Sequence, residues 1–125
     1  MEKQGMVSIW LGNVNSLDQL EEYIKYTYDE KGESVPSRFF EDFNIDMDET
    51  DEDFIEKGVL KKKSDKISEL LEGCSYIEAI LHNMNKSINL TKAYNAIILI
   101  YNFEYENYVG KSGQFQYIIS TSYLK

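Results

Sequence analysis

The most apolar stretch of the chain, residues 96–101 (Ala-Ile-Ile-Leu-Ile-Tyr), contains no charged residue and is rich in β-branched side chains. A short run of this kind is typical of a central strand buried on both faces. A second strand is expected over residues 115–123, where aromatic and β-branched side chains recur at every second position. The two glycines in residues 107–113 predict that these strands pair as a closing antiparallel hairpin.

The N-terminal half predicts another strand and a helix. Residues 6–11 form a short apolar run that ends at Gly12-Asn13, as expected of a buried strand followed by a turn. Ser16 and Gln19 fit a capping box, and apolar residues then recur at helical spacing as far as Tyr28. We therefore expect a helix over residues 17–28.

Shorter elements are expected in the rest of the chain. Residues 29–37 should be a loop, after which Ser37 could cap a helical turn through Phe43. A helix should begin at Ser64 and end at Gly73, and another should follow the capping box of residues 75–78 and end near Asn85. This order predicts an α+β fold, a single domain over residues 1–125 with a small, mainly antiparallel sheet and three to four helices packed on it.

Acidic side chains are concentrated in residues 41–56, a segment without lysine or arginine. The segment holds nine of them: Glu41, Asp42, Asp46, Asp48, Glu49, Asp51, Glu52, Asp53 and Glu56. Outside it the acidic and basic residues are equal in number, so the formal charge of −9 resides there. Its few apolar residues predict a loop with one or two anchored turns.

A localised negative field favours a partner with a basic surface, because it can steer such a partner during association. It disfavours nucleic acid, which is bound through clustered lysine and arginine. The only basic run, residues 61–63, is expected to be a solvated approach to a helix. The alternative for the acidic segment is a solvated loop that keeps the protein soluble, but four nearby phenylalanines could act as apolar anchors inside a charged rim: Phe39, Phe40, Phe43 and Phe54.

Catalytic groups are few. His82 is the only histidine and lies off the apolar stripe of its helix, so a surface position is expected. Cys74 is the only cysteine, which excludes an intrachain disulfide and favours a small packing role over a nucleophile. Gly110-Lys111-Ser112-Gly113 lacks the upstream glycine of a phosphate-binding loop and is interpreted as a hairpin turn. With no secretory leader or membrane span in the sequence, we expect a cytoplasmic protein.

The acidic segment also allows a cation-binding alternative. Asn44, Asp46 and Asp48 alternate as in a Ca²⁺ loop, but that register requires Gly at position 49 and Glu at 55, where the chain has Glu49 and Ile55. No cofactor is predicted. Weak cation binding and a carboxylate-based enzyme remain open as alternatives.

Several motifs carry a family resemblance. They are Ile9-Trp10-Leu11-Gly12-Asn13, Tyr28-Asp29-Glu30-Lys31-Gly32, Ser37-x-Phe39-x-x-Asp42-Phe43-x-Ile45-Asp46 and Asp51-Glu52-Asp53-Phe54. With these motifs the chain resembles the immunity protein 22 family, closely over residues 9–56 and in outline beyond them. The resemblance implies an α+β protein that accompanies a bacterial polymorphic toxin and protects the producing cell by binding the toxin domain. Residues 47–50 depart from the more aromatic, tyrosine-containing approach expected before the last motif.

The leading hypothesis is an immunity protein, without catalysis, that docks its acidic patch onto the basic face of a cognate toxin domain such as a nuclease. The expected contact residues are Asp46, Asp48, Glu49, Asp51, Glu52, Asp53 and Glu56. One alternative is a small carboxylate-rich metal-binding protein or enzyme. Another is a homo-oligomer that associates through the strand over residues 115–123.

Overall fold

The computed structural model describes residues 2–84, 90–106 and 109–124. The strands are β1 (Glu2–Gly12), β2 (Thr27–Tyr28), β3 (Ser34–Val35), β4 (Ile55–Ser64), β5 (Tyr94–Phe103), β6 (Lys111–Ser112) and β7 (Phe115–Ser122). The helices are α1 (Leu17–Tyr23), α2 (Arg38–Asp42), α3 (Ile67–Leu70) and α4 (Ile77–Asn83), with 3₁₀ turns η1 (Met47–Glu49) and η2 (Glu52–Phe54). Five strands form an antiparallel sheet in the order β4-β5-β1-β7-β6, and β2 pairs with β3. The predicted α+β class is confirmed.

Strand β1 lies at the centre of the sheet, between β5 and β7. The predicted pairing of β5 with β7 is therefore wrong, because β1 is apolar on both faces and takes the most buried place. The closing hairpin is instead the short one in which Lys111 lies opposite Gln116 and Ser112 opposite Phe115. Residues 110–113 lie in a hairpin as predicted, but Lys111 and Ser112 form its first strand and the turn itself is at Gly113 and Gln114.

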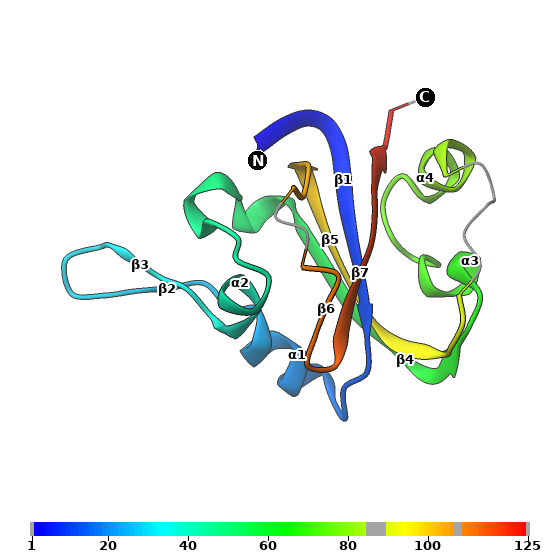
Figure 1. Ribbon diagram of the computed structural model, residues 1–125, viewed down its shortest axis with the longest axis horizontal. Helices are drawn as coiled ribbons and strands as arrows, with labels where there is room; N and C mark the ends of the chain where they lie inside the picture. The colour runs from blue at the N-terminus through cyan, green and yellow to red at the C-terminus, as the bar shows by residue number, and fades with distance from the viewer. Residues whose placement is uncertain (1, 85–89, 107–108, 125) are drawn as a thin grey trace.

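The sheet separates two hydrophobic cores, with α1 and α2 on one side and α3 and α4 on the other (Figure 1). One core is rich in aromatic rings and is centred on Trp10, which is fully buried against Phe39, Phe43, Tyr105 and Tyr117. The other is mainly aliphatic and receives the alternate residues of the central strands. We call these the aromatic face and the aliphatic face of the sheet.

Helix α1 begins as predicted. Ser16 Oγ accepts a hydrogen bond from the Gln19 amide at 3.1 Å, and Gln19 Oε1 accepts one from the Asn15 amide at 2.6 Å. The predicted end at Tyr28 is wrong, because the helix stops at Tyr23 and Tyr28 belongs to the β2–β3 hairpin. The predicted loop over residues 29–37 is confirmed except at Ser34 and Val35, which form β3.

The other helices are short. Ser37 is the N-cap residue of α2 as predicted, although its side chain makes no capping hydrogen bond. The predicted capping box before α4 is wrong, because Tyr76 occupies the N-cap position at φ 61° without a side-chain cap. The predicted end near Asn85 lies outside the described residues. Among the residues that the structure describes, no helix is long and apolar enough to cross a membrane.

Strand β4 was not expected from the sequence. It forms one edge of the sheet, and its register against β5 shifts between Val59 and Ser64. The three lysines of residues 61–63 are exposed and precede α3, as predicted, but they belong to the shifted part of this strand. Exposed lysines and irregular pairing on an edge strand hinder edge-to-edge association.

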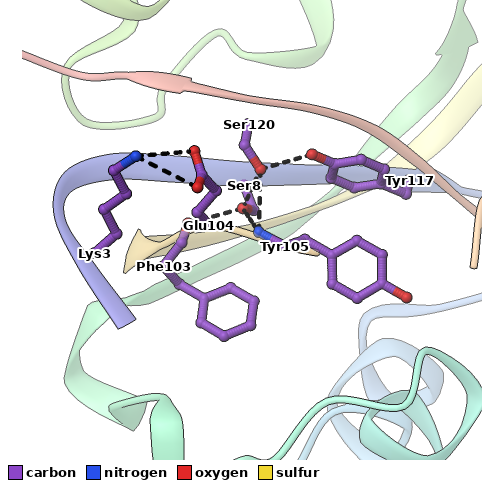
Figure 2. Close-up of polar contacts among 7 residues, drawn as sticks. All are labelled: Lys3, Ser8, Phe103, Glu104, Tyr105, Tyr117 and Ser120. Atoms are coloured by element: carbon purple, nitrogen blue, oxygen red, sulfur yellow. Dashed lines mark hydrogen bonds and ion pairs between the residues drawn. The ribbon is translucent and has the colours of Figure 1, made fainter. Parts of the chain in front are cut away.

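A hydroxyl network fixes the end of β5 across the central strand (Figure 2). Ser8 Oγ donates to the Phe103 carbonyl at 2.8 Å and accepts from the Tyr105 amide at 3.1 Å. Ser120 Oγ lies 2.6 Å from both Ser8 Oγ and the Tyr117 hydroxyl. The Tyr105 ring points away from this cluster, and its hydroxyl donates to the Phe43 carbonyl at 2.6 Å. This last hydrogen bond attaches Phe43, which follows α2 and precedes the 3₁₀ turns, to the end of β5.

Candidate protein-binding surface

Six of the seven predicted contact residues lie together in the two 3₁₀ turns and the residues that precede them. They are Asp46, Asp48, Glu49, Asp51, Glu52 and Asp53, and all six are exposed. We call this set the acidic surface. The sequence prediction of a loop with one or two anchored turns is confirmed, because η1 and η2 both fall within this segment.

Two of these carboxylates shape the backbone beneath them. Asp46 Oδ1 accepts a hydrogen bond from the Asp48 amide at 3.0 Å, and Asp51 Oδ1 accepts one from the Asp53 amide at 2.9 Å. Each carboxylate thus caps a 3₁₀ turn, as aspartate commonly does at a turn start. The caps satisfy backbone donors and also hold the neighbouring acidic side chains on the outside.

Buried residues between the carboxylates attach the segment to the aromatic face. Ile45 and Met47 are 5% and 4% exposed and belong to the aromatic core. The Ile45 amide donates to the Phe40 carbonyl at 2.8 Å, and Thr50 Oγ1 donates to the Met47 carbonyl at 2.7 Å. The acidic surface is therefore supported by packing, which limits the conformational entropy lost when a partner binds.

A hollow of about 300 Å³ lies within the acidic surface, lined by Tyr26, Tyr28, Met47, Thr50 and four of its carboxylates. The Tyr26 hydroxyl makes a short hydrogen bond with Thr50 Oγ1. Burial raises the pKa of Tyr26 to about 12, and the charges of Glu52 and Asp51 add to the rise against the opposing Thr50 hydrogen bond. The Tyr26 hydroxyl is thus neutral at physiological pH and contributes polarity without charge.

The acidic surface concentrates negative charge in a short segment. The ion pairs of Lys3, Lys25 and Arg38 have acidic partners that lie outside the acidic surface. Six carboxylates within residues 46–53 give a formal charge of −6 in eight residues. A basic partner would relieve this repulsion on binding.

Glu56, the seventh predicted contact residue, lies apart from the other six. It is the second residue of β4, and strand alternation turns it toward the aliphatic face while Ile55 packs against the aromatic core. Its Oε1 atom accepts hydrogen bonds from the Tyr101 hydroxyl at 2.5 Å and the Ser75 amide at 2.9 Å. Glu56 therefore joins β4 and β5 to the turn before α4.

The phenylalanines divide between core and surface. Phe39, Phe40 and Phe43 are at most 1% exposed and fill the aromatic core, whereas Phe54 is 47% exposed at the end of η2. Only Phe54 is therefore placed as an apolar anchor beside the acidic surface. Sequence could not make this division, because all four residues flank the same charges.

The remaining chemical candidates stay outside this surface. His82 is exposed, as expected. Cys74 is half-buried against the aliphatic core, and burial together with the Glu56 charge raises the pKa of its thiol to about 11, which disfavours the nucleophilic thiolate. Over residues 2–84, 90–106 and 109–124, no group of three or more His, Cys, Asp or Glu side chains is arranged to hold a metal ion.

Two features of the site were missed by the sequence reasoning. Tyr26 and Tyr28 reach the acidic surface because α1 ends early and the β2–β3 hairpin begins there. Their signal was the dense tyrosine content of residues 23–28, which the helical periodicity obscured. Asp42 was counted among the acidic residues, but its hydrogen bond from the Tyr23 hydroxyl at 2.8 Å could not be foreseen.

The geometry defines a small α+β protein that presents an acidic surface on a packed aromatic support. By family comparison, the chain belongs to the Immunity protein 22 family, whose model matches residues 7–123. Membership supports an immunity function in general and implies a toxin partner. Comparison with curated proteins and with solved structures finds no match.

Proposed function

We propose that this chain is a cytoplasmic immunity protein, folded as one domain, that binds and neutralises a cognate bacterial toxin domain through the acidic surface. The observation that carries this proposal is the set of six exposed carboxylates anchored by buried Ile45 and Met47. A preorganised anionic surface suits a basic protein partner.

Neutralisation then needs no catalysis by this chain. A toxin that acts on nucleic acid carries a basic groove for phosphates, since phosphate contacts supply much of the affinity for nucleic acid. A set of six carboxylates placed over such a groove competes with the substrate for the same cationic side chains. A nuclease domain is therefore the toxin class that we propose.

The proposal is tested by co-purifying this chain with the C-terminal domain of the protein encoded immediately upstream and by assaying that domain's toxicity or nuclease activity. We expect a stoichiometric complex that inhibits the neighbour's activity and weakens as salt rises, because charge pairs near the surface are screened. Failure to associate at low salt, with both partners folded, would remove the proposed function.

A further inference from the structure

A second hollow lies where α1, α2 and the β6–β7 turn meet on the aromatic face. It has a volume of about 220 Å³. Its lining includes Asn13, Gln19, Tyr23, Asp42, Gln114 and Phe115. We call it the Asn13 hollow. One of its lining residues, Asp42, ends α2 shortly before the segment that carries the acidic surface.

The walls of the Asn13 hollow are held by a fixed backbone frame. The Asn13 amide donates to the Gln114 carbonyl at 3.2 Å. The Val14 amide donates to Asn95 Oδ1 at 2.9 Å, and Asn95 Nδ2 donates to the Val14 carbonyl at 2.8 Å. A Cβ atom at Gly12 would lie 2.5 Å from the Phe115 ring, so this close approach requires glycine. The hollow is therefore preformed.

Asn13 presents an unusual acceptor at this place. Its Nδ2 atom donates to the Ala93 carbonyl at 3.5 Å, whereas its Oδ1 atom is buried and has no hydrogen-bond partner among the described residues. A buried acceptor left unpaired is costly, and such groups in native proteins usually have a partner. This oxygen has almost no exposed surface, so a ligand in the hollow does not reach it, and the charged acceptor of the hollow comes from α2.

Asp42 adds a carboxylate to the same hollow. Its Oδ2 atom accepts the 2.8 Å hydrogen bond from the Tyr23 hydroxyl, and its other oxygen accepts no hydrogen bond from the residues that the structure describes. The rings of Tyr23 and Phe115 stack with centroids 5.0 Å apart and form an apolar wall. A carboxylate beside an apolar aromatic wall matches a side chain with an aliphatic stem and a cationic head.

We propose that the Asn13 hollow receives an arginine side chain of the toxin domain and acts as a second, specificity-determining contact beside the acidic surface. Arginine fits better than lysine, because its planar guanidinium can stack on an aromatic ring while it donates to a carboxylate. This inference rests on the proposed function and names a partner group for it.

Arg38 also lines the hollow, and its side chain must move away from Asp42 before another cation can bind there. Its Nε atom lies 3.8 Å from Asp42 Oδ2, and its side chain is 78% exposed. An exposed pair at this distance is weak, so the side chain can turn toward solvent at little cost. Replacing Arg38 should therefore raise the affinity for a cationic occupant and lower the affinity for an anionic one.

The first test measures the affinity of variants for the toxin domain encoded upstream. Asp42→Asn keeps an acceptor for the Tyr23 hydroxyl but removes the charge, and we expect it to weaken binding about tenfold or more. Glu41→Gln is the matched control, an exposed neighbour on the same helix that does not line the hollow, and it should change affinity less than about twofold. Arg38→Gln should strengthen binding.

The second test uses N-acetyl-arginine methylamide as a probe, without the toxin. Titrated at millimolar concentration, it should perturb the NMR signals of Asn13, Tyr23 and Gln114 in the wild type and fail to do so in Asp42→Asn. Equal affinity of Asp42→Asn and wild type for the toxin would overturn the arginine contact and leave the proposed function standing. Weaker binding by Arg38→Gln would overturn it in favour of an anionic occupant. Perturbation confined to the acidic surface would also overturn it.

Discussion

The two faces of the sheet use acidic side chains in opposite ways. On the aromatic face, six carboxylates stand exposed over buried Ile45 and Met47. On the aliphatic face, Glu56 turns inward and accepts hydrogen bonds from Tyr101 and Ser75. Both groups come from one continuous acidic stretch, so the difference arises where η2 passes into β4 and the strand begins to alternate.

A run of acidic residues is therefore not one functional unit. The carboxylates in the 3₁₀ turns are exposed and repel one another, which suits them to a basic partner. Glu56 already has partners from the turn before α4 and from β5. We therefore expect the acidic surface to affect binding and Glu56 to affect stability.

The largest stability effect is expected in the core that supports the acidic surface. Phe39 is fully buried and contacts the rings of Trp10, Tyr23, Phe40 and Phe43. Phe39→Ala should lower the free energy of unfolding by about 3–5 kcal/mol, because it removes a large side chain and leaves a cavity. Urea denaturation measures this change.

Leu71→Ala is the matched change in the aliphatic core, where Leu71 is also fully buried. It should cost about 2–5 kcal/mol. Limited proteolysis should cut residues 44–54 faster in Phe39→Ala than in Leu71→Ala, because Phe39 lies in the helix that holds this segment. Equal cleavage in the two variants would show that the two cores support the acidic surface alike.

The next largest effect separates Glu56 from its neighbours. Glu56→Ala should lower the free energy of unfolding by about 1–3 kcal/mol, since the Tyr101 hydroxyl and the Ser75 amide lose their shared acceptor. Glu52→Ala, at an exposed position, should change stability by less than about 0.5 kcal/mol but weaken toxin binding. Chemical denaturation and a binding titration on both variants check these expectations. A larger loss of stability in Glu52→Ala than in Glu56→Ala would contradict them.

Alkaline pH should destabilise both faces through their tyrosines. Burial, supported by a hydrogen bond to a carboxylate, raises the pKa of Tyr23 and of Tyr101, and burial raises that of Tyr26 to about 12. Because the folded pKa exceeds the unfolded one, each contribution is present below about pH 10 and is lost as pH rises through the folded value. The melting temperature should fall above pH 10, and Tyr26→Phe should reduce the fall between pH 10 and about 12. A melting temperature independent of pH in this window would contradict the burial of these hydroxyls.

The smallest effect is expected from divalent cations. The carboxylates of the described residues form no metal-holding group, so Ca²⁺, Mg²⁺ or Mn²⁺ at about 1 mM should raise the melting temperature by less than about 2 °C. Thermal unfolding with and without each cation checks this expectation. A larger increase would favour the carboxylate-based metal-binding alternative over the toxin inhibitor.

Local patterns predicted the elements whose environment is uniform. Residues 96–101 are apolar throughout and form most of β5, and Ser16 caps α1 through a bond to an amide three residues away. Strand β4 was missed because it lies at the sheet edge and mixes lysines with few apolar residues. The partner of β7 is β1, more than a hundred residues earlier in the chain, and no local pattern encodes such a pairing.

The candidate site divides in the same way. The exposure of the six carboxylates follows from their charge, which sequence shows directly. The inward turn of Glu56 depends on β4, and the Asn13 hollow depends on three segments that meet only in the fold. Sequence could therefore predict the acidic surface but neither the role of Glu56 nor the hollow.

Toxin binding through the acidic surface is tested by a paired charge-neutralisation titration. The test variant combines Asp48→Asn, Glu49→Gln, Asp51→Asn, Glu52→Gln and Asp53→Asn, which retains Asp46 and leaves an asparagine to cap η2. The control removes five exposed carboxylates elsewhere, with Glu2→Gln, Glu30→Gln, Glu33→Gln, Glu72→Gln and Glu106→Gln, and has the same net charge.

Calorimetric titration with the upstream-encoded toxin domain, at low and moderate salt, compares the two folded variants with the wild type. We predict at least about a hundredfold weaker binding for the test variant and less than about threefold for the control. Equal weakening in both would show that net charge, and not this surface, steers the toxin. Unchanged affinity of the test variant in low salt would contradict the account.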